Sequence, residues 1–347
     1  MELNRSLLKD ATEHGLISEV QAQQLWQFLS ERGKDTPSFR ITHVLYYLGG
    51  LIAVIAMSVF MTLGWEHSKG WGVFFIALAY AGAGLWLTEY LLNRRQLPIP
   101  AGITATFVVL LTPLAVYGLI NELNLWGDGR EFRFYYYDPA SRLFMELATL
   151  ASGSVMLWRY RLPFLMMPIA VTLWFLGITL TQLIFRDING DADVILLWVE
   201  VVSLWPGLLI VVLGLWVDIR TRHDKDYAFW LYLVGVTAFW SDLSWMYSQH
   251  DPDKFIYLCI NLLLIVVGTM LLRKIFTVLG ALGTTWYLGY YAYDVFSGSM
   301  MFPFILTIIG LGVIYLGIIW QQHEQKFSRR LRKMLPVSVR ELVEKRQ

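Results

Sequence analysis

Long apolar stretches alternate with short polar connections over most of this 347-residue chain. Most of these stretches contain the roughly 20 helical residues that are needed to cross a hydrocarbon core about 30 Å thick. The pattern predicts an all-α polytopic membrane protein with about ten transmembrane helices. The predicted spans are residues 41–64, 70–92, 99–120, 141–158, 163–185, 194–217, 227–247, 255–272, 275–296 and 303–320.

Lysine and arginine residues lie mainly on one side of this succession of spans. Of the 28 such residues, 22 fall in the segment before the first span, the even-numbered connections and the segment after the last span. The odd-numbered connections hold the other six. Because cytoplasmic loops carry an excess of positive charge, the asymmetry predicts that both termini lie in the cytoplasm.

The chain divides into three zones: a cytosolic helical hairpin over 1–40, the transmembrane bundle over 41–320 and a basic amphipathic tail over 321–347. The hairpin buries only a thin apolar seam, so we expect it to dock on the membrane surface, on itself across a dimer or on a partner protein. The tail is expected to lie along the anionic cytoplasmic leaflet, where each basic residue contributes about 1 kcal/mol to binding. Its candidate lipid-binding residues are Arg329, Arg330, Arg332 and Lys333.

Two local signals define the second helix of the hairpin. Gly15 is placed to end the preceding helix in a left-handed cap. Ser18, followed three residues later by Gln21, is a capping-box pattern. We therefore expect a helix to begin directly after Ser18.

Composition agrees with a membrane protein and excludes several other classes. The chain is 56% hydrophobic and only 16% charged, whereas a soluble protein carries about 25% charged residues. Membrane orientation already explains the basic residues, so no nucleic-acid partner is expected. The single cysteine, Cys259, excludes a disulfide framework and a thiolate metal cluster. The six histidines form no HExxH motif and no GxSxG elbow occurs, so we expect no enzyme, cofactor or metal site.

Polar side chains inside the predicted spans are the best candidates for function. An ionisable group is costly in hydrocarbon and tends to face the bundle interior or a wet cavity. Helix orientation places three acids roughly 8–9 Å below the outer surface, with an asparagine at the matching level and a further acid nearer the surface. These residues either converge on an outward-facing site for a cation or a proton, or reach the interface as boundary carboxylates. The set is Glu146, Glu200, Asp242, Asn261 and Asp294.

Two features near these residues each admit two interpretations. Pro206 and Gly207 follow Glu200 in mid-span, as in an interrupted helix beside a transport site or in a helix kinked by packing. The outer connection 121–140 is rich in aromatic side chains. These are either anchors at the lipid–water boundary or a lid over an outward-facing cavity.

The N-terminal third of the chain resembles a known family. The resemblance is carried by His14-Gly15-Leu16-Ile17-Ser18, by the segment Leu25 to Leu29 and by Tyr46-Tyr47-Leu48-Gly49-Gly50. These motifs are similar to those of domain-of-unknown-function family 2157, a family of predicted bacterial membrane proteins. The resemblance implies a location in the bacterial inner membrane. That family has no agreed activity, so the resemblance implies no catalytic residues.

Two functions remain open at this point. The first is a transporter or ion-coupled permease with an outward-facing acidic site. The second is a non-transporting membrane scaffold or sensor that acts through the hairpin at 1–40. A deep, water-accessible cavity reaching Glu200 favours the first. A closed bundle with small residues such as Ala79, Ala83 and Gly84 at tight helix contacts favours the second.

Overall fold

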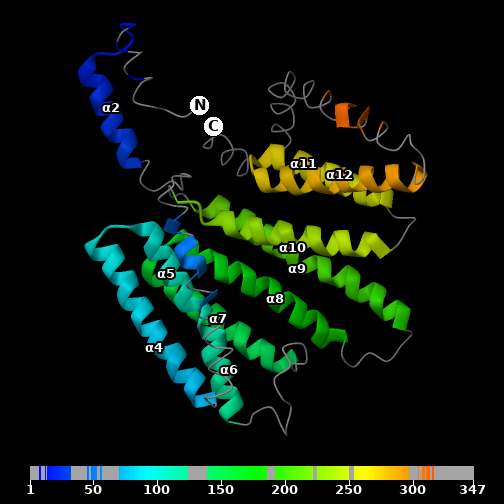
Figure 1. The fold of residues 1–347 in the computed structure, drawn as a ribbon, viewed down its shortest axis with the longest axis horizontal. Coiled ribbons are helices and arrows are strands. Elements are labelled where there is room, and N and C mark those ends of the chain that lie inside the picture. The colour runs from blue at the N-terminus through cyan, green and yellow to red at the C-terminus, as the bar shows by residue number, and fades with distance from the viewer. Residues whose placement is uncertain are drawn as a thin grey trace.

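The computed structural model describes residues 14–32, 70–123, 139–185, 192–221, 225–249 and 254–296, with scattered positions in 8–12, 45–56 and 304–315. Every regular element among these described residues is a helix (Figure 1), which confirms the all-α prediction for this part of the chain. The first and last predicted spans lie only partly within the described residues. The basic tail at 321–347 lies outside them, as does most of the aromatic connection at 121–140.

The second to ninth predicted spans all coincide with helices. The predicted span at 99–120 consists of two helices joined at Leu111, because Pro113 cannot donate a backbone hydrogen bond to the preceding turn. The helices after α2 (Glu19–Arg32) are α4 (Gly70–Glu89) with its π-helical end η2 (Tyr90–Arg94), α5 (Pro98–Leu110), α6 (Thr112–Glu122), α7 (Pro139–Tyr160), η3 (Pro163–Leu165), α8 (Met166–Phe185), α9 (Ala192–Arg220), α10 (Ala228–Gln249), α11 (Lys254–Leu271) and α12 (Lys274–Phe296).

Several of these helices have the length and composition of membrane spans. Large apolar side chains point outward from the bundle, among them Trp158 at 78% exposure and Trp86 at 69%, as expected for a surface that meets hydrocarbon. Phe255–Leu271 is also apolar but shorter. Four segments among the described residues are long and apolar enough to cross a membrane: Gly70–Arg94, Pro98–Glu122, Pro163–Phe185 and Trp198–Arg220.

The helix α2 begins as its sequence predicts. The Ser18 amide donates to Oε1 of Gln21 at 3.0 Å, and the Gln21 amide donates to Oγ of Ser18 at 3.2 Å. Gly15 adopts a φ of +70°, and its amide donates to the carbonyl of Thr12 at 3.0 Å. The capping box and the left-handed glycine are both confirmed. In Figure 1, α2 stands apart from the bundle.

The remaining helices pack largely in chain order. α4 packs on α5 and α6, α6 on α7, and α7 on α8, while α8 contacts both α9 and α10. α11 and α12 form a hairpin that docks on α10 (Figure 1). Tight turns connect η2 to α5 and α7 to η3. Gln96 and Arg161 adopt positive φ, and each precedes a Leu-Pro pair whose proline opens the next helix.

Glycine allows close approach at several of these interfaces. Gly84 of α4 is buried against Val108 of α5. Next to it, Oγ1 of Thr88 lies 2.9 Å from Oγ1 of Thr104, joining the same two helices. Ala79 and Ala83, in contrast, are exposed. The tight contacts of this hairpin therefore involve glycine and threonine, and these two alanines take no part.

Candidate functional site

Glu200 and Asp242 lie on the facing sides of α9 and α10. Gly207 of α9 packs against the backbone of Phe239, and Gly235 of α10 packs against Val211. Glu200 precedes Gly207 by seven residues and Asp242 follows Gly235 by seven. Two helical turns return a side chain to nearly the same face, so both acids lie on the surfaces that α9 and α10 present to each other.

The two acids occupy neighbouring levels of this interface. With Gly207 opposite Phe239, the antiparallel register places Asp242 level with Leu204. Glu200 then lies one turn, about 6 Å, nearer the predicted outer surface. Both side chains are half-buried. Oε2 of Glu200 is buried and has no hydrogen-bond partner among the described residues.

Glu146 lies at a different interface. Its carboxylate accepts a hydrogen bond from Thr179 of α8 at 2.7 Å, and Thr179 is only 1% exposed. Arg142, one helical turn before Glu146, donates a hydrogen bond from its guanidinium to Gln182 of α8. Gly177, two residues before Thr179, contacts α9. α8 therefore lies between Glu146 and the α9–α10 interface.

Asn261 and Asp294 are also separate from Glu200. Asn261 is fully buried, accepts a hydrogen bond from Nε1 of Trp240 at 3.1 Å and donates to the carbonyl of Tyr257 at 2.8 Å. Trp240 lies two residues from Asp242, and thus on nearly the opposite side of α10. Asp294 is exposed near the end of α12. Of the five predicted residues, the structure brings Glu200 and Asp242 to one interface.

The Pro-Gly pair after Glu200 packs tightly within a continuous helix. α9 runs from Ala192 to Arg220 through Pro206. The Pro206 ring contacts Gly177 of α8, and a Cβ at Gly207 would lie 2.5 Å from the Phe239 nitrogen. The pair thus forms close contacts on the predicted cytoplasmic side of the two acids. Pro206 has no amide hydrogen, so the carbonyl of Val202 lacks its helical donor.

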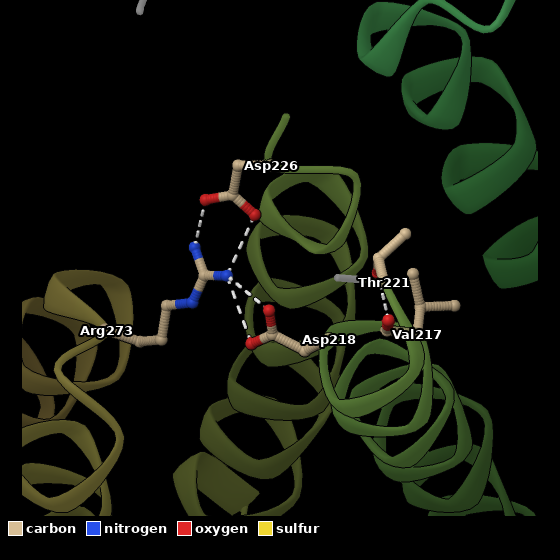
Figure 2. Close-up of polar contacts among 5 residues, drawn as sticks. All are labelled: Val217, Asp218, Thr221, Asp226 and Arg273. Carbon is tan, nitrogen blue, oxygen red and sulfur yellow. Dashed lines mark hydrogen bonds and ion pairs between the residues drawn. The ribbon is translucent and has the colours of Figure 1, made fainter. Parts of the chain in front are cut away.

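A second polar cluster lies at the other end of the same helices. Figure 2 shows the guanidinium of Arg273, from the turn between α11 and α12, held between Asp226 and Asp218. Nη1 donates to Asp226 at 2.5 Å and Nη2 at 2.8 Å, while Nη2 also donates to both Asp218 oxygens at 3.1 and 3.2 Å. The guanidinium carbon lies 4.9 Å from the ring centre of Tyr232. Thr221 ends α9 nearby by donating to the carbonyl of Val217.

The charge on Arg273 is secure despite its burial. Burial lowers its pKa, but the hydrogen bonds and negative charges of Asp226 and Asp218 outweigh that effect and raise the pKa above its ordinary value. At the same end, Tyr227 donates to the carbonyl of Arg161 at 2.6 Å. Three connections between helices are therefore tied together here.

Sequence reasoning counted Arg273 only as one positive charge among those that orient the protein. A signal was present, since Asp218 and Asp226 are acids on the side predicted to be basic. Their spacing alone does not reveal a common partner, because Arg273 comes from a connection that is remote in sequence.

Comparisons with known protein families, with curated proteins and with solved structures find no match to this chain.

Proposed function

We propose that this protein is an ion-coupled transporter, and that Glu200 and Asp242 bind the coupling cation or proton in the outer half of the α9–α10 interface. The observation that carries the proposal is the buried, unpartnered Oε2 of Glu200 on the same interface as Asp242. A carboxylate in that position gains a partner when it binds a cation or a proton.

The surroundings of the two acids support a site that opens to one side. The close contact of Gly207 with Phe239 lies on the inner side of Asp242 and leaves little space between the helices there. Carboxylates within membrane-spanning helices are among the groups that bind protons and cations in transporters.

The proposal also covers the membrane topology of the chain, its location in the cell and the family to which it belongs. It places about ten spans in the bacterial inner membrane, with both termini in the cytoplasm and the acids toward the outside. It includes anionic lipids as partners of the basic tail and membership of domain-of-unknown-function family 2157. The basic asymmetry supports the orientation, and the four long apolar helices support the membrane location.

The second candidate function is a membrane scaffold or sensor that acts through the N-terminal hairpin. It is favoured by apolar side chains that face solvent there, with Leu16 at 78% exposure and Val20 at 66%. The closely packed glycines of the bundle also agree with a closed structure.

The transporter proposal is tested with Glu200→Gln, which keeps the shape of the side chain and removes its charge. The full chain is reconstituted in liposomes that contain a pH-sensitive dye, and proton flux is followed under an imposed sodium or potassium gradient. We expect the wild-type protein to carry flux above that of empty liposomes. Glu200→Gln should return the flux to the empty-liposome level while keeping the wild-type thermal unfolding curve.

The matched control is Glu89→Gln. Glu89 is a carboxylate at the other end of the bundle, where it lies 3.6 Å from Arg159 with both side chains at least half exposed. The Glu89→Gln protein should carry the same flux as the wild type. Equal flux in Glu200→Gln and wild type would overturn the site. Wild-type flux no greater than that of empty liposomes would overturn transport and make the scaffold the leading function.

The topology is tested with reporters. A reporter fused after Gln347 should be active only in a cytoplasmic assay, and one inserted in the 121–140 connection only in an external assay, because 22 of 28 basic residues lie on the proposed cytoplasmic side. The reverse pattern would place Glu200 and Asp242 on the inner side and contradict an outward-facing site.

A further inference from the structure

The Arg273 cluster joins two helical hairpins at the end of the bundle remote from Glu200. Arg273 belongs to the α11–α12 turn, Asp218 to the last turns of α9, and Asp226 to the segment directly before α10. Asp218 lies eighteen residues after Glu200 in one continuous helix, a separation of about 27 Å along the axis. The cluster and the proposed ion site thus occupy opposite ends of α9 and α10.

An apolar layer lies next to the cluster, on the side toward the middle of the bundle. The ring of Tyr232, beneath the Arg273 guanidinium, meets Phe276 of α12 edge-on at 5.6 Å between ring centres. Tyr232 and Phe276 belong to one buried group with Leu264 and Leu279, and Leu215 of α9 packs against it. Separation of the two hairpins at this end would therefore break the ionic cluster first and the apolar layer next.

The construction suits a contact that forms and breaks. The α11–α12 hairpin docks on the rest of the described bundle mainly through α10, so it can move as one body. Asp226 is 45% exposed on its side chain, whereas Asp218 is 9% exposed. Water can therefore replace Arg273 at Asp226 during opening. Two carboxylates around one guanidinium also leave a net negative charge, which limits the stability of the closed form.

We infer that Arg273, with Asp218 and Asp226, is a latch that closes the cytoplasmic end of the α9–α12 unit. The latch opens when the Glu200–Asp242 site is exposed to the cytoplasm. This inference rests on the proposed function, since it assigns to that transporter the closure opposite its ion site. A two-state element of this kind lets one site be reached from one side of the membrane at a time.

The latch is tested by thiol accessibility, which requires no transport. Leu215→Cys is introduced together with Cys259→Ser, so that one thiol remains, and the protein is labelled with a membrane-impermeant maleimide in inside-out vesicles. In the parent protein Leu215 is packed against the Tyr232 group, and labelling should be slow. Arg273→Gln should label at least about tenfold faster, because removing one partner of a buried ionic cluster strongly shifts a two-state equilibrium.

A second variant and a matched control keep the result interpretable. Asp226→Asn leaves the Asp218 contact in place and should label faster than the parent by a smaller factor, so it serves if Arg273→Gln fails to fold. Lys274→Gln removes an exposed positive charge from the adjacent residue and should label at the parent rate. Folding of each variant is checked by its thermal unfolding curve.

Parent-like labelling of folded Arg273→Gln and Asp226→Asn would overturn the latch. Faster labelling only in right-side-out vesicles would overturn its cytoplasmic position. Faster labelling in inside-out vesicles combined with no flux in the wild-type protein would keep the conformational latch while removing the transporter. The two proposals therefore fail separately.

Discussion

Replacing Gly207 with alanine is expected to lower the free energy of unfolding by about 3 kcal/mol, the upper part of the usual range for overpacking. A Cβ at this position would lie 2.5 Å from the nitrogen, 2.8 Å from Cα and 2.9 Å from Cβ of Phe239. Two of these three atoms are backbone atoms, so no change of side-chain rotamer relieves the contact. α9 and α10 must move apart along the interface that holds Glu200 and Asp242.

The measurement is chemical unfolding of the purified protein in mixed detergent micelles. Gly82→Ala is the matched control, because a Cβ at Gly82 of α4 meets nothing within 4 Å. That substitution should raise stability slightly, since alanine is favoured over glycine in a helix interior by about 1 kcal/mol. If both variants change stability equally, the close contact of α9 with α10 is wrong.

Replacing Arg273 with methionine is expected to lower the free energy of unfolding by about 3–5 kcal/mol, the cost of breaking a buried ion pair by removing one partner. The side chains of Arg273 and Asp218 are 10% and 9% exposed, so methionine leaves Asp218 charged, buried and without its cation. The volume of the side chain is largely kept, and the loss is therefore mainly electrostatic. Unfolding in mixed micelles measures the effect.

The double variant Arg273→Met with Asp218→Asn separates charge from packing. It removes the stranded carboxylate and should be more stable than Arg273→Met alone, whereas a loss caused by packing would persist. Lys274→Met, at the exposed neighbouring position, should stay within about 0.5 kcal/mol of the wild type. A double variant no more stable than Arg273→Met would show that the carboxylate is not the source of the loss.

Much of the fold was predictable because helix length, apolar content and capping are local properties. The Ser18–Gln21 capping box lies where the pattern places it, and the predicted span at 275–296 differs from α12 by a single residue. The break at Leu111 does not follow from hydropathy, although Pro113 indicates an interruption of that span. Hydropathy measures length and apolar content, and it does not detect such a break.

The candidate site was only partly predictable. Depth in the bundle follows from counting residues along each helix, and the residues selected in this way include the buried Asn261 and the half-buried Glu200 but also the exposed Asp294. It carries no information on the direction of a side chain around the helix axis. For this reason it grouped Asn261 with Asp242, although the Trp240 hydrogen bond places Asn261 on another side of α10.

The sequence by itself determined that the described part of this chain is helical, where its helices lie and which side of them is basic, because each is a property of neighbouring residues. The tertiary structure decided which polar groups meet. The rotation of α9 against α10 is set by close contacts at Gly207 and Gly235, and it turns Glu200 and Asp242 toward the same interface. The partners of Arg273 likewise come from connections far apart in the chain, and packing of whole helices brings them within hydrogen-bond distance.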